Sequence, residues 1–244
     1  MPTYNLKVSE LVHLSKNAKA IRVNLDKKLF LFQPGQFVMM ELDLEKTNKF
    51  KVKDGKKPIQ KRPFSMSSTP LRKDYLEVTV KTTENAFVSD YFVNYLNKDE
   101  EIIVSGPFGK FYFDEKNTEE NIMLIGAGSG ISPLMSIFRF IHEKSLPISV
   151  HMLYSNKTQE EILWRKEIES LCKSPNLSHE FTLTREEWEG TKGRINKEMI
   201  LRGLISKDTH FYLCGPPEFV KSTELILLNE IGIKAENIKK EVYS

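Results

Sequence analysis

One stretch of nine residues combines a guanidinium, an aromatic ring and a row of hydroxyl groups: Arg62-Pro63-Phe64-Ser65-Met66-Ser67-Ser68-Thr69-Pro70. A guanidinium holds a phosphate through charge-assisted hydrogen bonds, and an aromatic side chain packs against a flat ring. Hydroxyl groups exchange hydrogen bonds with the polar edge of such a ring. The stretch therefore predicts a site for a flat, phosphate-bearing ring system.

A glycine-rich turn lies between a strand pattern and a helix pattern, at Gly126-Ala127-Gly128-Ser129-Gly130-Ile131-Ser132-Pro133. Glycines let the backbone approach a pyrophosphate, and a helix N-terminus offers free amides and the positive end of its dipole. The motif is Gly-x-Gly-x-x-Pro and lacks the third glycine of the dinucleotide fingerprint. Its spacing also differs from that of the Gly-x-Ser-x-Gly nucleophile elbow. We therefore expect either nucleotide binding or close helix–strand packing at this turn.

Neutral and basic residues follow the next two predicted strands, at Ser155-Asn156-Lys157-Thr158 and Thr184-Arg185. A carboxylate often occupies this edge of a nucleotide-binding sheet when the ligand is NAD, because it binds the ribose hydroxyls. Hydroxyl groups and cations there would tolerate a 2′-phosphate, which favours NADPH or the use of both nucleotides. A capping serine among solvated cations accounts for each residue taken singly equally well.

Cys214-Gly215-Pro216-Pro217 ends a further predicted strand, at the edge where the ligands of parallel sheets gather. A buried structural cysteine is the usual alternative, but two prolines directly after it would make a rigid rim and favour a functional position. The only other cysteine is Cys172, and the five histidines are scattered along the chain. The sequence therefore predicts no metal site and no iron–sulfur cluster in this chain.

The length of 244 residues suits two domains of about 100–150 residues each. A net charge of +3 is too small to indicate a nucleic-acid-binding protein. The most apolar window, residues 122–141, contains three glycines, a proline and Arg139, so we predict no transmembrane segment. No signal-peptide pattern opens the sequence, and a cytoplasmic location is expected.

The elements that must position these groups follow two different rhythms. The first half alternates short strand patterns with turn residues and holds one helix pattern, at residues 88–96, which predicts an antiparallel β-barrel with a capping helix. From residue 119 strand and helix patterns alternate, with one helix pattern over residues 159–173. This alternation predicts an α/β Rossmann-like domain with a parallel sheet of about five strands. The polar segment between them divides the chain into residues 1–115 and 116–244.

Residues 43–61 contain seven lysines against three acidic residues, a local net charge of +4. A solvated hairpin or loop is the simplest interpretation. The alternative is a docking surface for an acidic partner protein, because charged patches of this kind speed association.

Five motifs together resemble the ferredoxin–NADP reductase superfamily in order and spacing: Pro34-Gly35-Gln36-Phe37, Arg62-Pro-Phe-Ser65, Gly106-Pro-Phe-Gly109, Gly128-x-Gly-x-x-Pro133 and Cys214-Gly-Pro-Pro217. Residues 154–167 resemble the cytochrome b5 reductase branch in particular. The resemblance covers nearly the whole chain. It implies an FAD-binding barrel, an NAD(P)-binding α/β domain and an NAD(P)H-dependent flavin oxidoreductase.

The resemblance also implies roles for single residues. Hydride would pass from nicotinamide C4 to flavin N5 between the domains, with Ser65 and Cys214 as the orienting catalytic groups. Tyr243 would cover the flavin, or would pack against the edge of the last strand. The implied cofactor-binding residues are Arg62, Pro63, Phe64, Ser65, Val80, Lys81, Ser89 and Tyr243 around the flavin, and Gly128, Gly130, Ser132, Pro133, Ser155, Lys157, Thr184, Arg185, Cys214, Gly215 and Pro216 toward the nucleotide.

Two positions depart from the family pattern. Ala86 stands where the family has the glycine of Gly-x-x-Ser, which leaves FAD against FMN open. Thr184 stands where NADH-using relatives frequently carry an acid, which again favours NADPH.

The electron acceptor is not specified by any motif. We expect a small, acidic redox protein, such as a ferredoxin, a flavodoxin, a cytochrome or an oxygenase component. The alternatives are a reductase of free flavin and an electron-transfer subunit of a larger complex. Related subunits of such complexes carry a C-terminal cysteine cluster, and this sequence has none.

Overall fold

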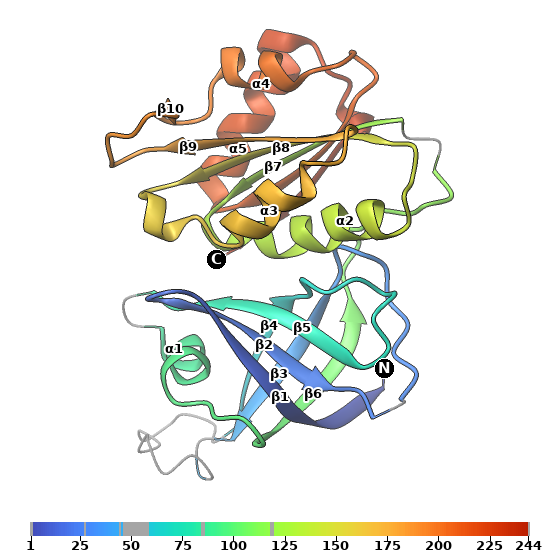
Figure 1. Ribbon diagram of the computed structural model, residues 1–244, viewed down its shortest axis with the longest axis vertical. Helices are drawn as coiled ribbons and strands as arrows, with labels where there is room; N and C mark the ends of the chain where they lie inside the picture. The colour runs from blue at the N-terminus through green and yellow to red at the C-terminus, as the bar shows by residue number, and fades with distance from the viewer. Residues whose placement is uncertain are drawn as a thin grey trace.

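The computed structural model describes residues 2–26, 28–43, 45, 59–83, 86–117 and 120–243, which form two stacked parts (Figure 1). The first part contains six antiparallel strands: β1 (Thr3–Ser15), β2 (Ala18–Asn24), β3 (Phe37–Asp43), β4 (Ile59–Ser65), β5 (Tyr75–Lys81) and β6 (Glu101–Phe108). Their order in the sheet is β4-β3-β6-β1-β2-β5. Most of the lysine-rich segment, residues 44 and 46–58, lies outside the described residues.

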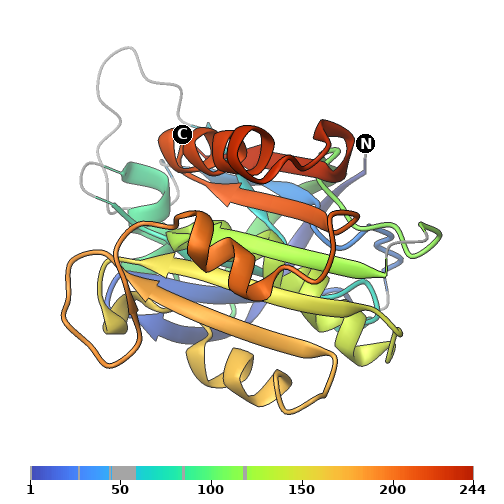
Figure 2. The same cartoon turned by 90° about the horizontal axis from the view of Figure 1, so that it is seen from above.

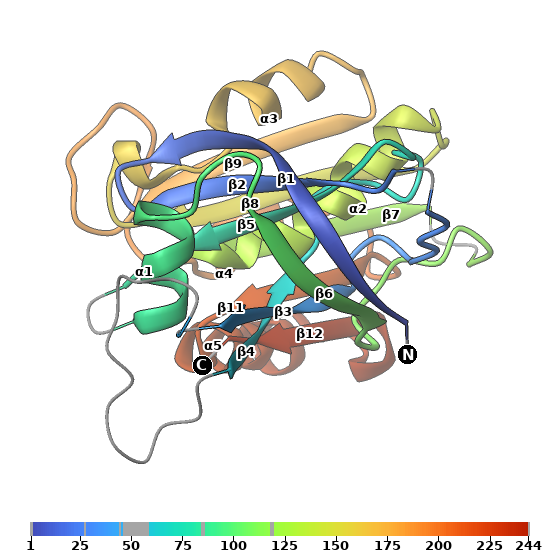
Figure 3. The ribbon, with the colours of Figure 1, turned by 90° about the horizontal axis from the view of Figure 1, so that it is seen from below.

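The first sheet curls so that its two edge strands meet. Met66, directly after β4, forms an antiparallel bridge with Val78 of β5. Figure 3 shows the strands β1 to β6 of this sheet from below. Alternate residues of β3 point inward, because side chains of a strand alternate between its faces, and they bury Val38, Met40 and Leu42. This arrangement confirms the predicted antiparallel barrel.

Among the described residues of the barrel part there is one helix, α1 (Phe87–Asn94), which packs beside β5. It buries Val88, Tyr91, Phe92 and Val93 in the same apolar cluster as the inward side chains of the strands. Its predicted role as a cap of the barrel stays a prediction.

The second part alternates strands and helices. Its strands are β7 (Asn121–Ala127), β8 (Ser149–Asn156), β9 (Leu177–Leu183), β10 (Thr191–Lys192), β11 (His210–Gly215) and β12 (Ile238–Val242), in the order β10-β9-β8-β7-β11-β12. Its helices are α2 (Ile131–Glu143), α3 (Arg165–Leu171), α4 (Lys197–Gly203) and α5 (Pro217–Leu225), which continues as the π-helical segment η3 (Ile226–Ile231). Three short 3-10 turns complete this part: η1 (Gly128–Gly130), η2 (Gln159–Glu161) and η4 (Ala235–Asn237).

All six strands of this sheet are parallel, so their carboxyl ends share one edge (Figure 2). The predicted parallel, Rossmann-like sheet is confirmed, with six strands where about five were predicted. The sixth strand is β10, whose two residues are too few to give a periodic signal in the sequence. The proposed division between residues 1–115 and 116–244 falls in the connection from β6 to β7.

Helices α2 and α3 lie between the parallel sheet and the barrel, while α4 and α5 cover the opposite face (Figure 1). Residues 131–141 of α2 are all buried, because the helix is covered by the sheet on one side and by the barrel on the other. No helix in the described ranges combines the length and the apolar character that crossing a bilayer requires.

The segment after β8 differs from the single helix over residues 159–173 that the sequence predicts. The structure has the turn η2, then α3, and the residue between them, Trp164, adopts a left-handed conformation with φ 60°. Such a conformation costs about 1–3 kcal/mol for a bulky residue. It turns the indole toward the barrel, where the indole N–H donates to Thr79 Oγ1 at 3.1 Å.

The glycine-rich turn packs directly onto β11. A Cβ atom on Gly130 would lie 2.2 Å from the carbonyl oxygen of Cys214 and 2.9 Å from the amide nitrogen of Gly215. Gly128 faces open space instead but has a φ of +54°. Gly130 is therefore required by close backbone approach, and Gly128 by its backbone conformation.

We predict that Gly130→Ala lowers the free energy of unfolding by about 3 kcal/mol, because the backbone of β11 has to shift to admit the methyl group. Gly128→Asn is the matched control and should cost less than about 1 kcal/mol, since asparagine tolerates a positive φ. Urea unfolding of both variants measures the difference. Equal losses would contradict the close-approach interpretation.

Candidate active site

A cavity of about 560 Å³ lies where the barrel meets the carboxyl edge of the parallel sheet. Its walls come from the end of β4, the end of β5, the start of α1, the glycine-rich turn and the C-terminal residues. Eight residues singled out from the sequence line it: Arg62, Pro63, Phe64, Ser65, Lys81, Ser89, Ser132 and Tyr243. The fold thus gathers groups that are up to 181 positions apart in the chain (243 − 62).

A second cavity of about 580 Å³ lies at the other end of β3 and β4, between Asp43, Ile59 and Tyr95. None of the residues singled out from the sequence lines it. The cavity at the domain boundary is therefore the candidate site.

The end of β4 supplies a cation and an aromatic ring. The Arg62 guanidinium is exposed, donates to the carbonyl of Lys61 at 2.8 Å and pairs with no carboxylate among the described residues. The Phe64 ring packs edge-to-face against Phe92 of α1, with 5.5 Å between ring centroids, which fixes its orientation. The site thus presents a free guanidinium beside a fixed ring.

The N-terminus of α1 faces the same cavity. Ala86, Phe87, Val88 and Ser89 line it, and no side chain caps this end of the helix. Uncapped amides at a helix N-terminus bind anions, because they lack partners and carry the positive end of the helix dipole. Together with Arg62 they offer donors for a pyrophosphate.

Four side chains, from β4, β11, β12 and the residue after β12, form a cluster beside the cavity, and two of them, Ser65 and Tyr243, line it. Ser65 Oγ lies 2.6 Å from Tyr243 Oη and donates to Glu241 Oε2 at 3.4 Å. Glu241 of β12 is the register partner of Cys214 of β11, and Tyr243 donates its amide to the carbonyl of Gly215 at 3.1 Å. The two predicted catalytic residues, Ser65 and Cys214, therefore belong to one cluster.

Burial disfavours the charged forms of the ionisable side chains in this cluster. Burial raises the pKa of the Cys214 thiol and of the Tyr243 hydroxyl. Burial also raises the pKa of Glu241 to about 7, and the hydrogen bond from Ser65 opposes that rise only in part. Cys214 is thus a neutral thiol at neutral pH, suited to packing and hydrogen bonding and not to nucleophilic attack.

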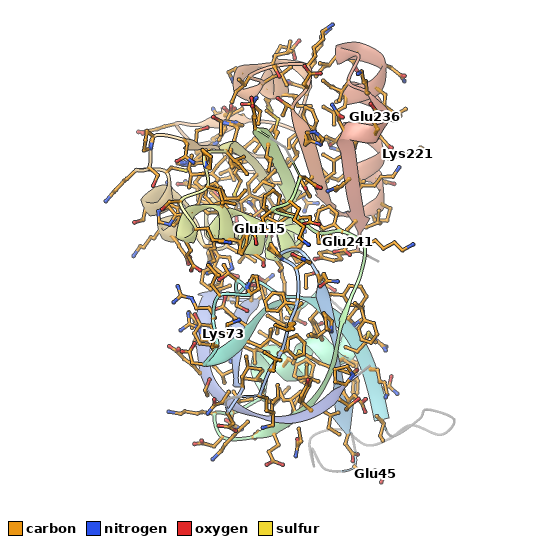
Figure 4. All side chains as sticks on the ribbon, turned by 90° about the vertical axis from the view of Figure 1, so that its right-hand side faces the viewer. Glu45, Lys73, Glu115, Lys221, Glu236 and Glu241 are labelled. Carbon is orange, nitrogen blue, oxygen red and sulfur yellow. The ribbon has the colours of Figure 1, made fainter. Side chains whose placement is uncertain are left out.

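Glu241 was not among the residues singled out from the sequence. It lies two positions before Tyr243, on the same face of a strand, at the boundary between the two parts (Figure 4). Pairing the last predicted strand in parallel with the strand that ends at Cys214 would have placed it beside the thiol. The signal was therefore present in the sequence.

The two segments predicted to bind the nucleotide lie at neighbouring strand ends, outside the lining of the cavity. The amides of Thr184 and Arg185 donate to the carbonyls of Asn156 and Lys157 at 2.9 and 3.0 Å, which brings the two predicted segments together. Lys157, Thr184 and Arg185 are exposed, and Ser155 is buried. Val80 and Pro133 are buried and do not line the cavity.

A barrel edge with anion donors, closed against the carboxyl edge of a parallel sheet, defines a reductase that uses a flavin and a pyridine nucleotide. Residues 5–113 match the family model of the oxidoreductase FAD-binding domain, and residues 124–224 match that of the oxidoreductase NAD-binding domain. The chain belongs to the ferredoxin–NADP reductase family.

The named relatives include two kinds of reductase. The chain is 31% identical to NADH-cytochrome b5 reductase 2 of Aspergillus oryzae over 87% of its own length and 66% of that protein. It is 27% identical to the glycine betaine monooxygenase reductase subunit of Chromohalobacter salexigens, over 82% of this chain and 53% of that one. The chain thus spans about two thirds of the first relative and about half of the second.

A solved structure has the same fold. The cytochrome b5 reductase domain of Ulva prolifera nitrate reductase superposes with a TM-score of 0.85, over 98% of this chain and 97% of that one, at 21% identity. The likeness establishes the two-domain fold.

The residues present fit a bound FAD. Arg62 and the N-terminus of α1 offer the donors that its phosphates need, and Phe64 offers a ring face. Ser65 offers a hydroxyl at the inner end of the cavity. Among the described residues, no three metal-ligating side chains come together.

The raised pKa of Glu241 makes stability depend on pH. Between about 4.5, its usual pKa, and about 7, the folded state holds a proton that the unfolded state has lost. The contribution of Glu241 to the free energy of unfolding therefore falls as pH rises through this range. We predict that Glu241→Gln becomes progressively more stable relative to the wild type over the same range, as measured by urea unfolding.

Glu236→Gln is the control for this prediction, because Glu236 lies just before the same strand and its side chain is 76% exposed (Figure 4). Its stability relative to the wild type should not change with pH in this way. Parallel pH profiles for the two variants would contradict the burial of the Glu241 carboxyl.

Proposed function

We propose that this chain is a reductase module that takes hydride from NAD(P)H onto bound FAD and passes electrons to a small redox protein. The observation that carries the proposal is the cavity that joins Arg62, Phe64 and the start of α1 to the glycine-rich turn. Bound FAD supplies the chemistry, because it accepts hydride as an electron pair and can release the electrons singly. The protein supplies binding, alignment and the exclusion of water.

The residues of the cavity take distinct parts in this proposal. Arg62 and the amides of α1 bind phosphate, and Phe64 holds the ring system in place. Ser65 offers a hydrogen bond at the inner end, and Cys214 is a buried neighbour of Tyr243. Glu241, with a pKa of about 7, holds a proton at its carboxyl near Ser65. No nucleophilic side chain is required.

Tyr243 lines the cavity and shares a hydrogen bond with Ser65. A nicotinamide that approaches Ser65 has to displace this ring. We propose that Tyr243 covers the flavin until the nucleotide binds.

For the nucleotide, we propose that NADPH is preferred to NADH. Lys157 and Arg185 are exposed cations, and neither forms an ion pair with another described residue. The nearest following acid, Glu186, accepts hydrogen bonds from the backbone amide and the side-chain amide of Gln159 at 2.7 and 3.0 Å. It is therefore engaged elsewhere and does not offer a free carboxylate for the ribose.

The relatives support a protein acceptor, because one is named for cytochrome b5 and one for a monooxygenase. We propose a small redox protein of this kind. The lysine-rich segment supports an acidic partner through its charge alone, and a cytoplasmic location stays a prediction from the sequence.

Replacing Lys51, Lys53, Lys56 and Lys57 should slow reduction of a protein acceptor and leave ferricyanide reduction unchanged, since only the protein acceptor needs docking.

The flavin itself gives the first test. We predict that the purified protein is yellow, and that mass spectrometry of the released cofactor identifies FAD. Arg62→Ala should weaken flavin binding about tenfold or more, because a charge-assisted contact is worth about 1.5–3 kcal/mol. Lys61→Ala is the matched control, since Lys61 pairs with Glu41 and does not line the cavity. A colourless protein that turns over added flavin would instead indicate a free-flavin reductase.

The nucleotide preference has its own test. We predict that replacing Lys157 and Arg185 together by alanine lowers kcat/KM for NADPH by about tenfold or more and changes kcat/KM for NADH by less than about threefold. Steady-state kinetics with ferricyanide measures both values. A wild-type enzyme that prefers NADH, as the name of the fungal relative states for that protein, would contradict the proposal.

A further inference from the structure

One face of α2 carries polar side chains at a spacing of four, three and four residues: Ser132, Ser136, Arg139 and Glu143. This spacing places them along a single stripe of the helix. Every member makes a hydrogen bond to the barrel: Ser132 to the carbonyl of Thr79, Ser136 to the carbonyl of Ser68, Arg139 to the carbonyl of Ser67 and to Glu77, and Glu143 with Thr69 and Arg72. The barrel thus holds α2 along most of its length.

Helix α2, which these hydrogen bonds attach to the barrel, begins at the glycine-rich turn. Ser129 of that turn and Ser132 of α2 line the candidate active site, and so does Thr79 of β5. The polar stripe therefore sets the position of the nucleotide side of the cavity relative to the barrel side.

Arg139 and Glu77 form the charged centre of this stripe. Glu77 is fully buried and Arg139 is 8% exposed. Arg139 Nη1 donates to Glu77 Oε1 at 2.6 Å and to the carbonyl of Ser67 at 2.7 Å. Arg139 Nε and Nη2 donate to the two carboxylate oxygens of Glu167 in α3, at 2.6 and 2.8 Å. One side chain thus joins β5, the loop after β4, and α3.

The buried carboxylate of Glu77 has further hydrogen-bond donors besides Arg139. It also accepts from Arg22 Nε and Ser67 Oγ, each at 2.8 Å. Burial alone raises the pKa of its carboxyl, but the Arg139 guanidinium and these hydrogen bonds more than offset that rise, so the pKa lies below its usual value. The carboxylate is charged, and removing Arg139 alone would leave that charge buried without its main partner.

Trp164 links the same centre to the cavity wall. The Arg139 guanidinium lies 4.3 Å from the centre of the Trp164 ring. The indole N–H donates to Thr79 Oγ1, which in turn donates to Ser67 Oγ at 3.0 Å. The left-handed backbone of Trp164 is thus held where its ring meets both Arg139 and a residue that lines the site.

Stability alone does not account for a buried ion pair in this place. Replacing such a pair by apolar residues of similar volume is often neutral or stabilising. A forked guanidinium differs from an apolar contact in that it fixes direction as well as distance. Hydride transfer needs that precision, because a misplacement of about 1 Å can cost about a hundredfold in rate.

We propose that Arg139, paired with Glu77, is a positioning residue for hydride transfer: it fixes the glycine-rich turn at a set distance and angle from the barrel wall of the cavity. This inference rests on the proposed function. It assigns Arg139 no contact with either cofactor.

The first measurement uses flavin-free protein. The sequence has two tryptophans, so Trp188→Phe leaves Trp164 as the only fluorophore of this kind. In that background, Arg139→Lys should raise acrylamide quenching of Trp164 at least about twofold and shift its emission to longer wavelength, because the interface around the indole opens. Arg202→Lys is the matched control, since Arg202 grips Glu180 through two bonds within the α/β part alone.

The second measurement uses flavin-loaded protein. Arg139→Lys should slow reduction of bound flavin by saturating NAD(P)H at least about tenfold, with the dissociation constants of flavin and nucleotide changed less than about threefold. The double variant Glu77→Gln/Arg139→Met removes both charges and so avoids an unpaired buried carboxylate. It should fold as stably as Arg139→Lys or better and remain slow.

Three results would overturn the inference. They are an unchanged rate in Arg139→Lys, a loss of rate that follows an equal loss of flavin affinity, and recovery of the rate in the double variant. If the protein binds no flavin at all, the proposed function fails, while the Trp164 measurement still decides whether Arg139 holds the two parts together.

Discussion

The meeting of the barrel with the carboxyl edge of the parallel sheet is the constraint on which the rest of the site depends. At this boundary Ser65, the last residue of β4, lies 2.6 Å (Oγ to Oη) from Tyr243, which directly follows β12. Parallel strands end at one edge, so everything at the carboxyl ends of β7, β8, β11 and β12 faces the barrel once this contact is made. The cavity lies between the barrel and the parallel sheet, which share apolar packing around α2 and are held together by the polar contacts of that helix.

Charge is distributed unevenly across that boundary. Exposed cations, Arg62 at the end of β4 and Lys157 and Arg185 after β8 and β9, suit phosphate groups. Of these, Arg62 lines the cavity. The inner end carries groups whose pKa burial raises, Cys214, Glu241 and Tyr243, which suit an uncharged ring.

The sequence predicted the site where the chemistry is local. Arg62, Phe64 and Ser65 lie within four residues, and the glycine-rich turn is a continuous motif, so residue type and spacing carried the information. Glu241 and Arg139 were missed as functional groups because their partners are distant: Ser65 is 176 positions from Glu241, and Glu77 is 62 positions from Arg139. Only the pairing of strands and the facing of α2 reveal them.

Local patterns also failed where tertiary contacts decide the backbone. Helical periodicity predicted one helix across residues 159–173, but the contact of Trp164 with Thr79 and Arg139 interrupts it. The short strand β10 has no signal of its own and forms by pairing with β9. In both cases the interaction that determines the backbone involves residues outside the segment itself, so the periodicity of that segment does not reveal it.

The most direct test of the account is anaerobic mixing of the flavin-loaded protein with NADH or NADPH while flavin absorbance is followed. If the cavity aligns the two cofactors, one nucleotide or both will bleach the bound flavin completely in a single turnover, with no other protein added. If both nucleotides bind and the flavin keeps its oxidised spectrum, the two walls of the cavity do not bring the reacting rings together, and the central claim is wrong.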